Sequence, residues 1–278
     1  MLIQWFPGHM TKALREMQES IKLIDAVLYV LDARCPYACL NPEFQKLIGN
    51  KPCMFVLNKA DLADEAKLQM WRAYFSKFGI VTDCVASQSK SRGKLLTGLQ
   101  KTLTEFFRKN EAKQIRKNAR CMVLGVPNSG KSTVINCLCQ SKRAVTGDKP
   151  GVTKGKQWVR LAEGLELLDT PGTLWPSFAD QGLARHLAYV GSIKDDILDV
   201  TELAAELLSE LMQLYPKETA LRYDLQGTKD LLLQVCDRKH CIGAGGVPDE
   251  LRAAKMVLDD FRKGKIARIT LEVPSSAE

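Results

Sequence analysis

The sequence predicts an α/β fold with a mainly parallel sheet, and two observations support this class. Short apolar runs alternate with longer helix-like stretches through the first 178 residues. Such runs are typical of strands that are buried on both faces of a parallel sheet. The strand pattern then disappears, and amphipathic stretches continue to the C-terminus. We therefore expect a sheet domain at 1–178 with helices on both faces, followed by a small all-helical domain at 179–278.

The individual elements follow from the same runs. Strands are expected at 26–31, 53–57, 80–85, 121–124, 157–161 and 165–168. Helices are expected at 10–23, 64–78, 94–108 and 131–139, and in the second domain near 197–214, 228–237 and 248–263. The segment 108–120 carries six basic residues and one acid, with little apolar content. We expect it to be a surface linker between two halves of the sheet domain.

Composition and charge limit the classes of function. The chain is 45% hydrophobic and 26% charged, which is ordinary for a soluble globular protein. Residues 1–178 carry 27 Lys and Arg against 15 Asp and Glu, a surplus of +12, whereas residues 179–278 carry 13 against 17, or −4. A basic surplus of this size favours a polyanionic partner such as RNA, and a solvated basic face is the alternative.

The same residues point to a cytoplasmic protein. No apolar run approaches the roughly 18 residues that a membrane-spanning helix needs, and the first ten residues lack the pattern of a secretion signal. The nine cysteines form no spacing typical of a disulfide or zinc framework. We therefore expect a reduced protein in the cytoplasm, without a membrane partner, and a monomer.

The segment GVPNSGKS at 125–132 matches the phosphate-binding loop pattern G-x-x-x-x-G-K-[ST]. An expected strand precedes it and an expected helix follows, which is the context that the pattern requires. Lys131 would reach the β and γ oxygens of a nucleotide, and the Ser132 hydroxyl would bind Mg²⁺. The residues expected to bind phosphate are Asn128, Ser129, Gly130, Lys131, Ser132 and Thr133, with Lys131 also catalytic.

Two further segments predict the rest of a magnesium and γ-phosphate site. DTPG at 169–172 follows the strand expected at 165–168. Asp169 would support the Mg²⁺ shell, and the backbone N–H of Gly172 would bind the γ-phosphate. Between this motif and the phosphate loop lies KPGVTKGK, in which Thr153 is the candidate for a second protein ligand of Mg²⁺.

A guanine-binding segment is predicted by NKAD at 58–61, which ends an apolar strand. The carboxylate of Asp61 can accept bonds from N1–H and from the 2-amino group of guanine, which adenine lacks. Asn58 can bond the opposite edge of the base, and the Lys59 stem can pack over it. Since a buried carboxylate left unpaired by a wrong base is costly, the selectivity can be large. Ala86 and Ser87 follow the next strand and would offer N–H groups to the guanine O6.

The order of these motifs is circularly permuted. In most GTPases the phosphate loop comes first, but here NKAD and Ala86–Ser87 precede it. The same sheet can form if the usual chain ends are joined, and 108–120 lies where that join must be. The permutation places the helical domain directly after DTPG, whose surroundings change with the γ-phosphate. We therefore expect a nucleotide-driven reorientation of the helical domain.

The permuted order and several segments closely resemble the YlqF/RbgA family of ribosome biogenesis GTPases. These segments are WFPGHM at 5–10, DAR at 32–34, GVPNSGKS, PGVTKG, DTPGTLWP and the C-terminal GKIARITLE at 264–272. The resemblance covers nearly the whole chain. It implies a GTPase that acts late in assembly of the large ribosomal subunit, binding its rRNA in the GTP state, leaving on hydrolysis and stimulated by the particle. It also implies an RNA-binding helical domain, whose charge of −4 here argues against a broad RNA footprint.

The resemblance further implies roles for two residues. His9 would be the catalytic residue that orients water, because the family lacks the glutamine that usually follows DxxG; helix capping or RNA binding by His9 is the alternative. Asn128 resembles the asparagine that coordinates K⁺ in cation-activated GTPases. The residue after DTPG is Thr173, which departs from the family pattern. Mg²⁺ and K⁺ are thus the expected cofactors.

Other functions are compatible with a nucleotide site. The main alternative is a nucleotide-dependent RNA- or protein-binding switch with negligible turnover and a non-ribosomal partner. A membrane-trafficking GTPase is disfavoured, because the chain shows no prenylation or myristoylation motif. A small-molecule kinase would leave NKAD unexplained.

Overall fold

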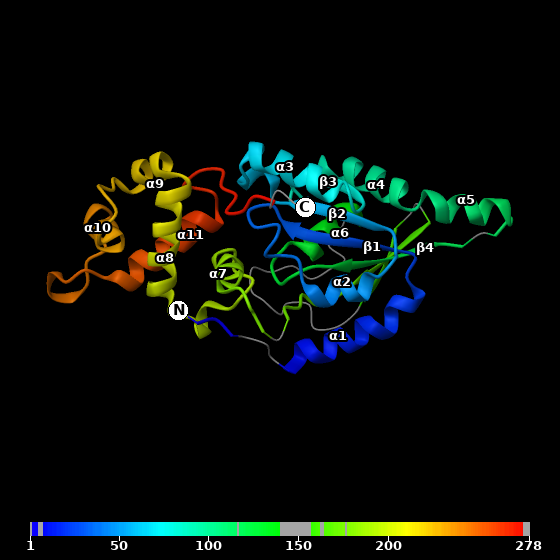
Figure 1. The fold of residues 1–278 in the computed structure, drawn as a ribbon, viewed down its shortest axis with the longest axis horizontal. Coiled ribbons are helices and arrows are strands. Elements are labelled where there is room, and N and C mark those ends of the chain that lie inside the picture. Colours follow the sequence, from blue (N-terminus) through cyan, green and yellow to red (C-terminus); the bar gives the residue numbers. More distant parts are fainter. Residues whose placement is uncertain are drawn as a thin grey trace.

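The computed structural model describes residues 2–4, 8–115, 117–139, 157–161, 164–175 and 177–274, and it does not describe the side chain of His9. Its described residues form two lobes that lie side by side along the long axis (Figure 1). One lobe is built on a sheet, and the other is a bundle of helices. The last described residues lead from the bundle back to the sheet lobe, so the two lobes are joined twice.

The described residues of the sheet lobe form a six-stranded sheet in the order β3-β2-β1-β4-β6-β5. The strands are β1 (Ala26–Asp32), β2 (Cys53–Asn58), β3 (Ile80–Cys84), β4 (Ala119–Leu124), β5 (Gln157–Arg160) and β6 (Leu165–Asp169). Neighbouring strands are parallel, apart from β5, which is antiparallel to β6. The central strands are buried along their whole length, which explains their continuous apolar runs. The predicted α/β class is confirmed.

Helices cover both faces of this sheet. α1 (Gly8–Ser20), α2 (Pro42–Ile48) and α3 (Glu65–Phe75) share one core with alternate residues of β1, such as Tyr29. α4 (Ser91–Thr102) and α6 (Lys131–Cys139) share the other core with the residues between them, such as Leu28. This alternation is the period-two pattern of a strand that separates two layers.

The segment predicted as a linker is shorter than expected. α5 (Thr104–Ala112) extends through its first residues, and β4 already includes its last two, so only 113–118 connects helix to strand. The reason is apolar packing, because Phe106 and Phe107 lie against the core under α4 and α6. The prediction of a linker over 108–120 was therefore wrong at both ends, although this join does connect the two halves of the sheet.

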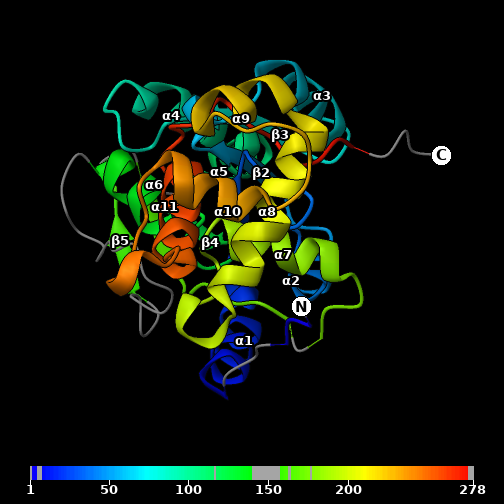
Figure 2. The ribbon, with the colours of Figure 1, turned by 90° about the vertical axis from the view of Figure 1, so that its left-hand side faces the viewer.

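The second lobe contains α7 (Gln181–Tyr189), α8 (Val200–Leu214), α9 (Pro216–Tyr223), α10 (Leu231–Arg238) and α11 (Glu250–Arg262). In Figure 2 this lobe faces the viewer, with α8 and α11 in front and the sheet lobe behind them. Aspartates cap three of the helices: the side chains of Asp180, Asp199 and Asp249 accept hydrogen bonds from first-turn N–H groups. The core of this bundle is continuous with the α1–α3 core. Among the described residues, no helix is long and apolar enough to cross a membrane.

Candidate functional site

The predicted motifs meet at the carboxyl edge of the sheet. β2 ends at Asn58, β6 ends at Asp169, and β4 leads through the loop 125–130 into α6. Because parallel strands end at one edge, segments far apart in the sequence come together there. Ligands bind at this edge in open α/β sheets. The structure thus assembles one site from both halves of the permuted sequence.

The phosphate loop is a tight turn held by its own carbonyl groups. Val126 O accepts hydrogen bonds from Ser129 Oγ at 3.0 Å and from Lys131 Nζ at 2.9 Å. Asn128 and Gly130 have positive φ angles of 58° and 94°. A side chain at Gly130 would collide with the amide nitrogen of Asn58, so this position requires glycine both for its φ and for its space.

Lys131 is a buried cation at the start of α6. Its side chain is 6% exposed. Burial lowers the pKa of Lys131 to about 8, although the carboxylate of Asp169 opposes the shift. A nucleotide phosphate brought beside this ammonium group would raise the pKa of Lys131 again. The environment of Lys131 is therefore suited to an anion.

Asp169 and Ser132, the two predicted Mg²⁺ ligands that the structure describes, are hydrogen-bonded to each other near Lys131. Ser132 Oγ donates a hydrogen bond to Asp169 Oδ2 at 3.3 Å, and the second oxygen, Oδ1, is buried without a partner among the described residues. Burial raises the pKa of Asp169, with Lys131 opposing. A carboxylate oxygen and a hydroxyl are the hard ligands that Mg²⁺ prefers, so these two residues fit the ion. Thr153, the second predicted ligand, lies outside the described residues.

The DTPG turn lies directly against the phosphate loop. A Cβ added at Gly172 would come within 2.7 Å of both Lys131 Nζ and Pro127, which excludes any other residue without rearrangement. The next residue, Thr173, is fully buried, and its hydroxyl has no partner among the described residues. Leu174 N lies 3.4 Å from the sulfur of Met10 in α1. This contact brings the N-terminal helix beside the DTPG turn, one residue after His9.

The NKAD residues tie three loops together. Asn58 Nδ2 donates to Ser129 O at 2.9 Å, and Asn58 Oδ1 accepts from Ala86 N at 3.1 Å. Lys59, with a φ of 59°, donates to Asn128 O at 2.8 Å. The structure therefore uses Asn58 and Lys59 as braces between the phosphate loop and the 86–87 loop. Asp61 and Ser87 are exposed at the same edge, where a base could reach them. The base contacts themselves stay predictions.

Asp32 and Arg34 belong to this site, although neither was among the predicted site residues. Asp32 ends β1, forms a two-bond ion pair with Arg34 at 2.8 and 2.9 Å, and lies 2.8 Å from Lys59 Nζ. Burial opposes ionisation, but Arg34 and Lys59 hold the pKa of Asp32 far below its ordinary value. Arg34 also donates to the carbonyls of Phe261 and Arg262 at the end of α11. An acid at the end of a buried parallel strand was the signal that could have found them.

The phosphate loop also contacts the helical lobe. Asn128 Nδ2 donates to Gly191 O at 2.6 Å, and Ser192 Oγ donates to Pro127 O at 2.7 Å. Gly191 and Ser192 form the turn that follows α7. The amide nitrogen of Asn128 is therefore engaged with the helical lobe, while K⁺ coordination would use its oxygen. That coordination stays a prediction.

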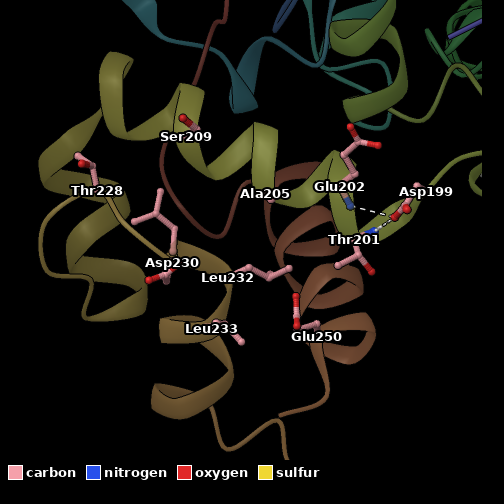
Figure 3. Close-up of a pocket in the computed structure, with 11 residues that line it drawn as sticks. Asp199, Thr201, Glu202, Ala205, Ser209, Thr228, Asp230, Leu232, Leu233 and Glu250 are labelled. Atoms are coloured by element: carbon pink, nitrogen blue, oxygen red, sulfur yellow. Dashed lines mark hydrogen bonds between the residues drawn. The ribbon is translucent and has the colours of Figure 1, made fainter. Parts of the chain in front are cut away.

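A separate pocket of about 550 Å³ lies in the helical lobe (Figure 3). Helices α8 and α10 and the start of α11 line it, and it contains none of the motif residues. Its carboxylates come from Asp199, Glu202, Asp230 and Glu250, and its described lining includes no Lys or Arg. A surface of this charge repels nucleic acid, which agrees with the acidic balance of this half of the chain.

These features together define a GTPase with a phosphate-binding loop, assembled in circularly permuted order. A family model described as "50S ribosome-binding GTPase" matches residues 120–240. The chain is 41% identical to Ribosome biogenesis GTPase A of Priestia megaterium, over 100% of this chain and 99% of that protein. It is 32% identical to Mitochondrial ribosome-associated GTPase 1 of Mus musculus, over 97% and 90% of the two chains.

Solved structures agree with the sequence relatives. A GDP-bound structure of TM YlqF matches with a TM-score of 0.70 and 26% identity, covering 94% of this chain and 100% of that one. The GNP-bound YlqF from T. maritima matches with a TM-score of 0.66 and 28% identity, over 96% and 100%. The chain belongs to the ribosome biogenesis GTPase A (YlqF/RbgA) family, and its reaction is the hydrolysis of GTP.

Proposed function

We propose that this GTPase acts late in assembly of the large ribosomal subunit, binding the immature particle in its GTP state and leaving after hydrolysis. The observation that carries the proposal is the similarity along the full length to proteins named Ribosome biogenesis GTPase A. The family description "50S ribosome-binding GTPase" supports the large subunit as the particle. The charge surplus of +12 in residues 1–178 supports contact with rRNA through the sheet lobe.

In this proposal the nucleotide lies along the carboxyl edge of the sheet. Lys131 and the N–H groups of the phosphate loop hold the phosphates, and Gly172 closes on the γ-phosphate. Asp61 reads the guanine edge from the exposed turn after β2. Mg²⁺, held by Ser132, Thr153 and Asp169, would neutralise charge that develops on the phosphates. The Oδ1 atom of Asp169 supports this assignment, because it is buried and has no hydrogen-bond partner within the described part of the chain.

The residue that positions the attacking water is proposed to be His9. Support comes from the contact of Met10 with Leu174, two residues after DTPG, because it brings the start of α1 beside the turn that is proposed to bind the γ-phosphate. A neutral imidazole at this place could accept a hydrogen bond from water. Thr173, directly after DTPG, is the alternative, but its burial leaves its hydroxyl little access to solvent.

The proposal is tested by GTP turnover in potassium buffer, with and without purified large ribosomal subunits, and with small subunits as the control. Stimulation by large subunits alone is expected, and replacing K⁺ with Na⁺ should lower the rate if Asn128 holds the ion. His9→Ala should then lose stimulated turnover while keeping its affinity for GDP. Equal rates with and without particles would reject the ribosome-triggered reaction and favour a nucleotide switch with another partner.

A further inference from the structure

The C-terminal residues Arg268–Glu272 form a strap across the edge of the sheet that holds the nucleotide motifs. The strap follows α11 and returns from the helical lobe to the sheet lobe, where Figure 1 shows it as the red segment that reaches α3. Ile269 and Thr270 are buried there, 1% and 0% exposed. The strap lies between the turn after β1 and the turn after β2.

The strap is bonded to the turn that carries Asp61. Ile269 N donates to Leu62 O at 2.8 Å, and Arg268 Nε donates to Asp61 O at 3.0 Å. The hydroxyl of Thr270 accepts a hydrogen bond from Asp64 N at 3.2 Å. The strap thus contacts the middle and the C-terminal end of the short 3₁₀ helix Ala60–Leu62 and the residue Asp64 that lies beyond it.

Other contacts anchor the strap itself. The hydroxyl of Thr270 donates to Ala33 O at 3.1 Å, and Leu271 N donates to Arg34 O at 2.8 Å. The carbonyl of Thr270 accepts from Lys67 Nζ at 2.7 Å and from Tyr215 Oη at 3.0 Å. Because Tyr215 ends α8, the strap is fixed from the sheet lobe and from the helical lobe together.

The turn at 60–62 depends on such support. It is a single turn of 3₁₀ helix, and no side chain caps its N-terminus. A helix of this kind has weak hydrogen-bond geometry of its own. The carboxylate of Asp61 is exposed, so its direction is set mainly by the backbone that carries it. A carboxylate that must accept two hydrogen bonds from one base edge tolerates little error in that direction.

We infer that the strap is a specificity-determining part of the guanine site, in which Arg268 is the positioning residue for Asp61. The inference rests on the proposed contact of Asp61 with guanine. It makes guanine recognition depend on a segment from the far end of the chain. Release of the strap would weaken the guanine contact while leaving the phosphate loop intact.

The test compares the affinities of Arg268→Ala for GDP and for inosine diphosphate, whose base lacks the 2-amino group. A misplaced Asp61 carboxylate weakens two hydrogen bonds to GDP, from N1–H and the 2-amino group, but only the N1–H bond to inosine diphosphate. Affinity should therefore fall about fivefold for GDP and about twofold for inosine diphosphate. Arg268→Lys keeps an N–H donor and should recover part of the discrimination. Lys263→Ala is the matched control, because Lys263 is an exposed base near the strap that pairs with Asp259.

The ratio of the two affinities separates positioning from general effects. Loss of a positive charge would weaken the binding of both nucleotides by the same factor, so it would leave the ratio unchanged. Thermal unfolding reports any loss of the fold. An unchanged ratio in Arg268→Ala would overturn the inference. Asp61→Ala tests the guanine contact separately from the strap. If this variant loses the preference for GDP over inosine diphosphate, the contact of Asp61 with guanine stands, whatever the result for Arg268→Ala. If Asp61→Ala keeps that preference, the base contact and the strap inference both fail.

Discussion

The ammonium group of Lys131 donates a hydrogen bond at 2.9 Å to the carbonyl of Val126, across the phosphate loop that it closes. This bond occupies the lysine that we propose to hold the nucleotide phosphates. Binding therefore exchanges a neutral carbonyl for an anion. The pKa of Lys131, lowered by burial to about 8, should rise when the phosphates arrive.

Proton uptake on binding tests this exchange. At pH 7 the free lysine is almost fully protonated, whereas at pH 8.5 about three-quarters of it is neutral. GDP binding should thus take up about 0.1 proton at pH 7 and about 0.75 proton at pH 8.5. The measurement is titration calorimetry in two buffers that differ in ionisation enthalpy. Ser132→Ala keeps Lys131 and should show the same uptake; a value independent of pH would contradict this account.

A second prediction concerns the metal. Asp169→Asn keeps the shape of the side chain but removes its charge, so the Mg²⁺ concentration needed for half-maximal turnover should rise about 10- to 100-fold. A magnesium titration of GTP hydrolysis gives this midpoint. Glu166→Gln is a suitable control on the same strand, because Glu166 pairs with Arg120 and Arg160 away from the site. Equal midpoints in Asp169→Asn and the wild type would remove Asp169 from the metal site.

The fold was largely predictable from the sequence because β1 and β2 are buried throughout and β4 is buried except at Arg120. Their apolar runs carry a clear signal, and α6 matches its predicted bounds of 131–139. The short helices α2, α7 and α9 were not predicted, whereas α6, which is equally short, was indicated by the motif that precedes it. Such short helices depend on caps and packing more than on periodicity. The cap of α2, for example, is Asn41, which is itself fixed by the carbonyl of Thr173.

The candidate site was predictable only where a motif is local. GVPNSGKS and DTPG are read from adjacent residues, and the structure places them together. The braces Asn58–Ser129 and Lys59–Asp32 join residues that are remote in sequence, so no local pattern indicates them. Arg268, the strap residue that bonds the carbonyl of Asp61, is 207 positions away from Asp61 in the sequence. Contacts of this kind become visible only when the sheet and the bundle are placed relative to each other.

A third prediction concerns the buried pair Asp32 and Arg34. Asp32→Ala leaves a buried guanidinium without its carboxylate and should cost about 3–5 kcal/mol in the free energy of unfolding. GDP affinity should also fall, because Lys59 loses its partner beside the phosphate loop. Chemical denaturation and nucleotide titration measure the two effects. Glu43→Ala breaks the exposed pair with Lys46 and should cost under about 0.5 kcal/mol. Similar losses in both variants would contradict the assignment.

A fourth prediction concerns His186, which joins two acids from different segments. Its Nδ1 lies 2.7 Å from Glu272 and its Nε2 lies 2.7 Å from Glu210. Burial opposes protonation, but these hydrogen bonds outweigh it and raise the pKa of His186 to about 9. Because the folded protein holds this proton more tightly than the unfolded chain, the contribution to stability is complete below pH 6.5 and is lost as pH rises through 9.

The loss should amount to about 3 kcal/mol between these pH values. Chemical denaturation of the wild type and of His186→Gln at pH 6, 7.5 and 9 isolates it, since other groups titrate in both proteins. The wild type should be the more stable protein at pH 6, and the difference should shrink towards pH 9. A constant difference would mean that His186 is not protonated in the folded state.

The last prediction tests the nucleotide-driven reorientation of the helical lobe. Gly172 lies against Pro127, and the carbonyl of Pro127 accepts a hydrogen bond from the hydroxyl of Ser192 in the turn after α7. A shift of the DTPG turn towards a γ-phosphate would therefore press on the same loop that holds the helical lobe. Small-angle scattering should give different profiles for the protein with GDP and with a non-hydrolysable GTP analogue.

Ser192→Ala removes the contact without touching the proposed nucleotide ligands, so it should reduce the difference between the two scattering profiles. Ser209→Ala, on α8 in the separate acidic pocket, is the control and should preserve the difference. Identical profiles for the wild type in both nucleotide states would reject the reorientation itself. If the two profiles of Ser192→Ala still differ as in the wild type, the reorientation occurs without this contact. The movement would then be transmitted through the covalent connection at residues 173–180. Because that connection leads directly from DTPG into α7, only the comparison of the two variants separates the two routes.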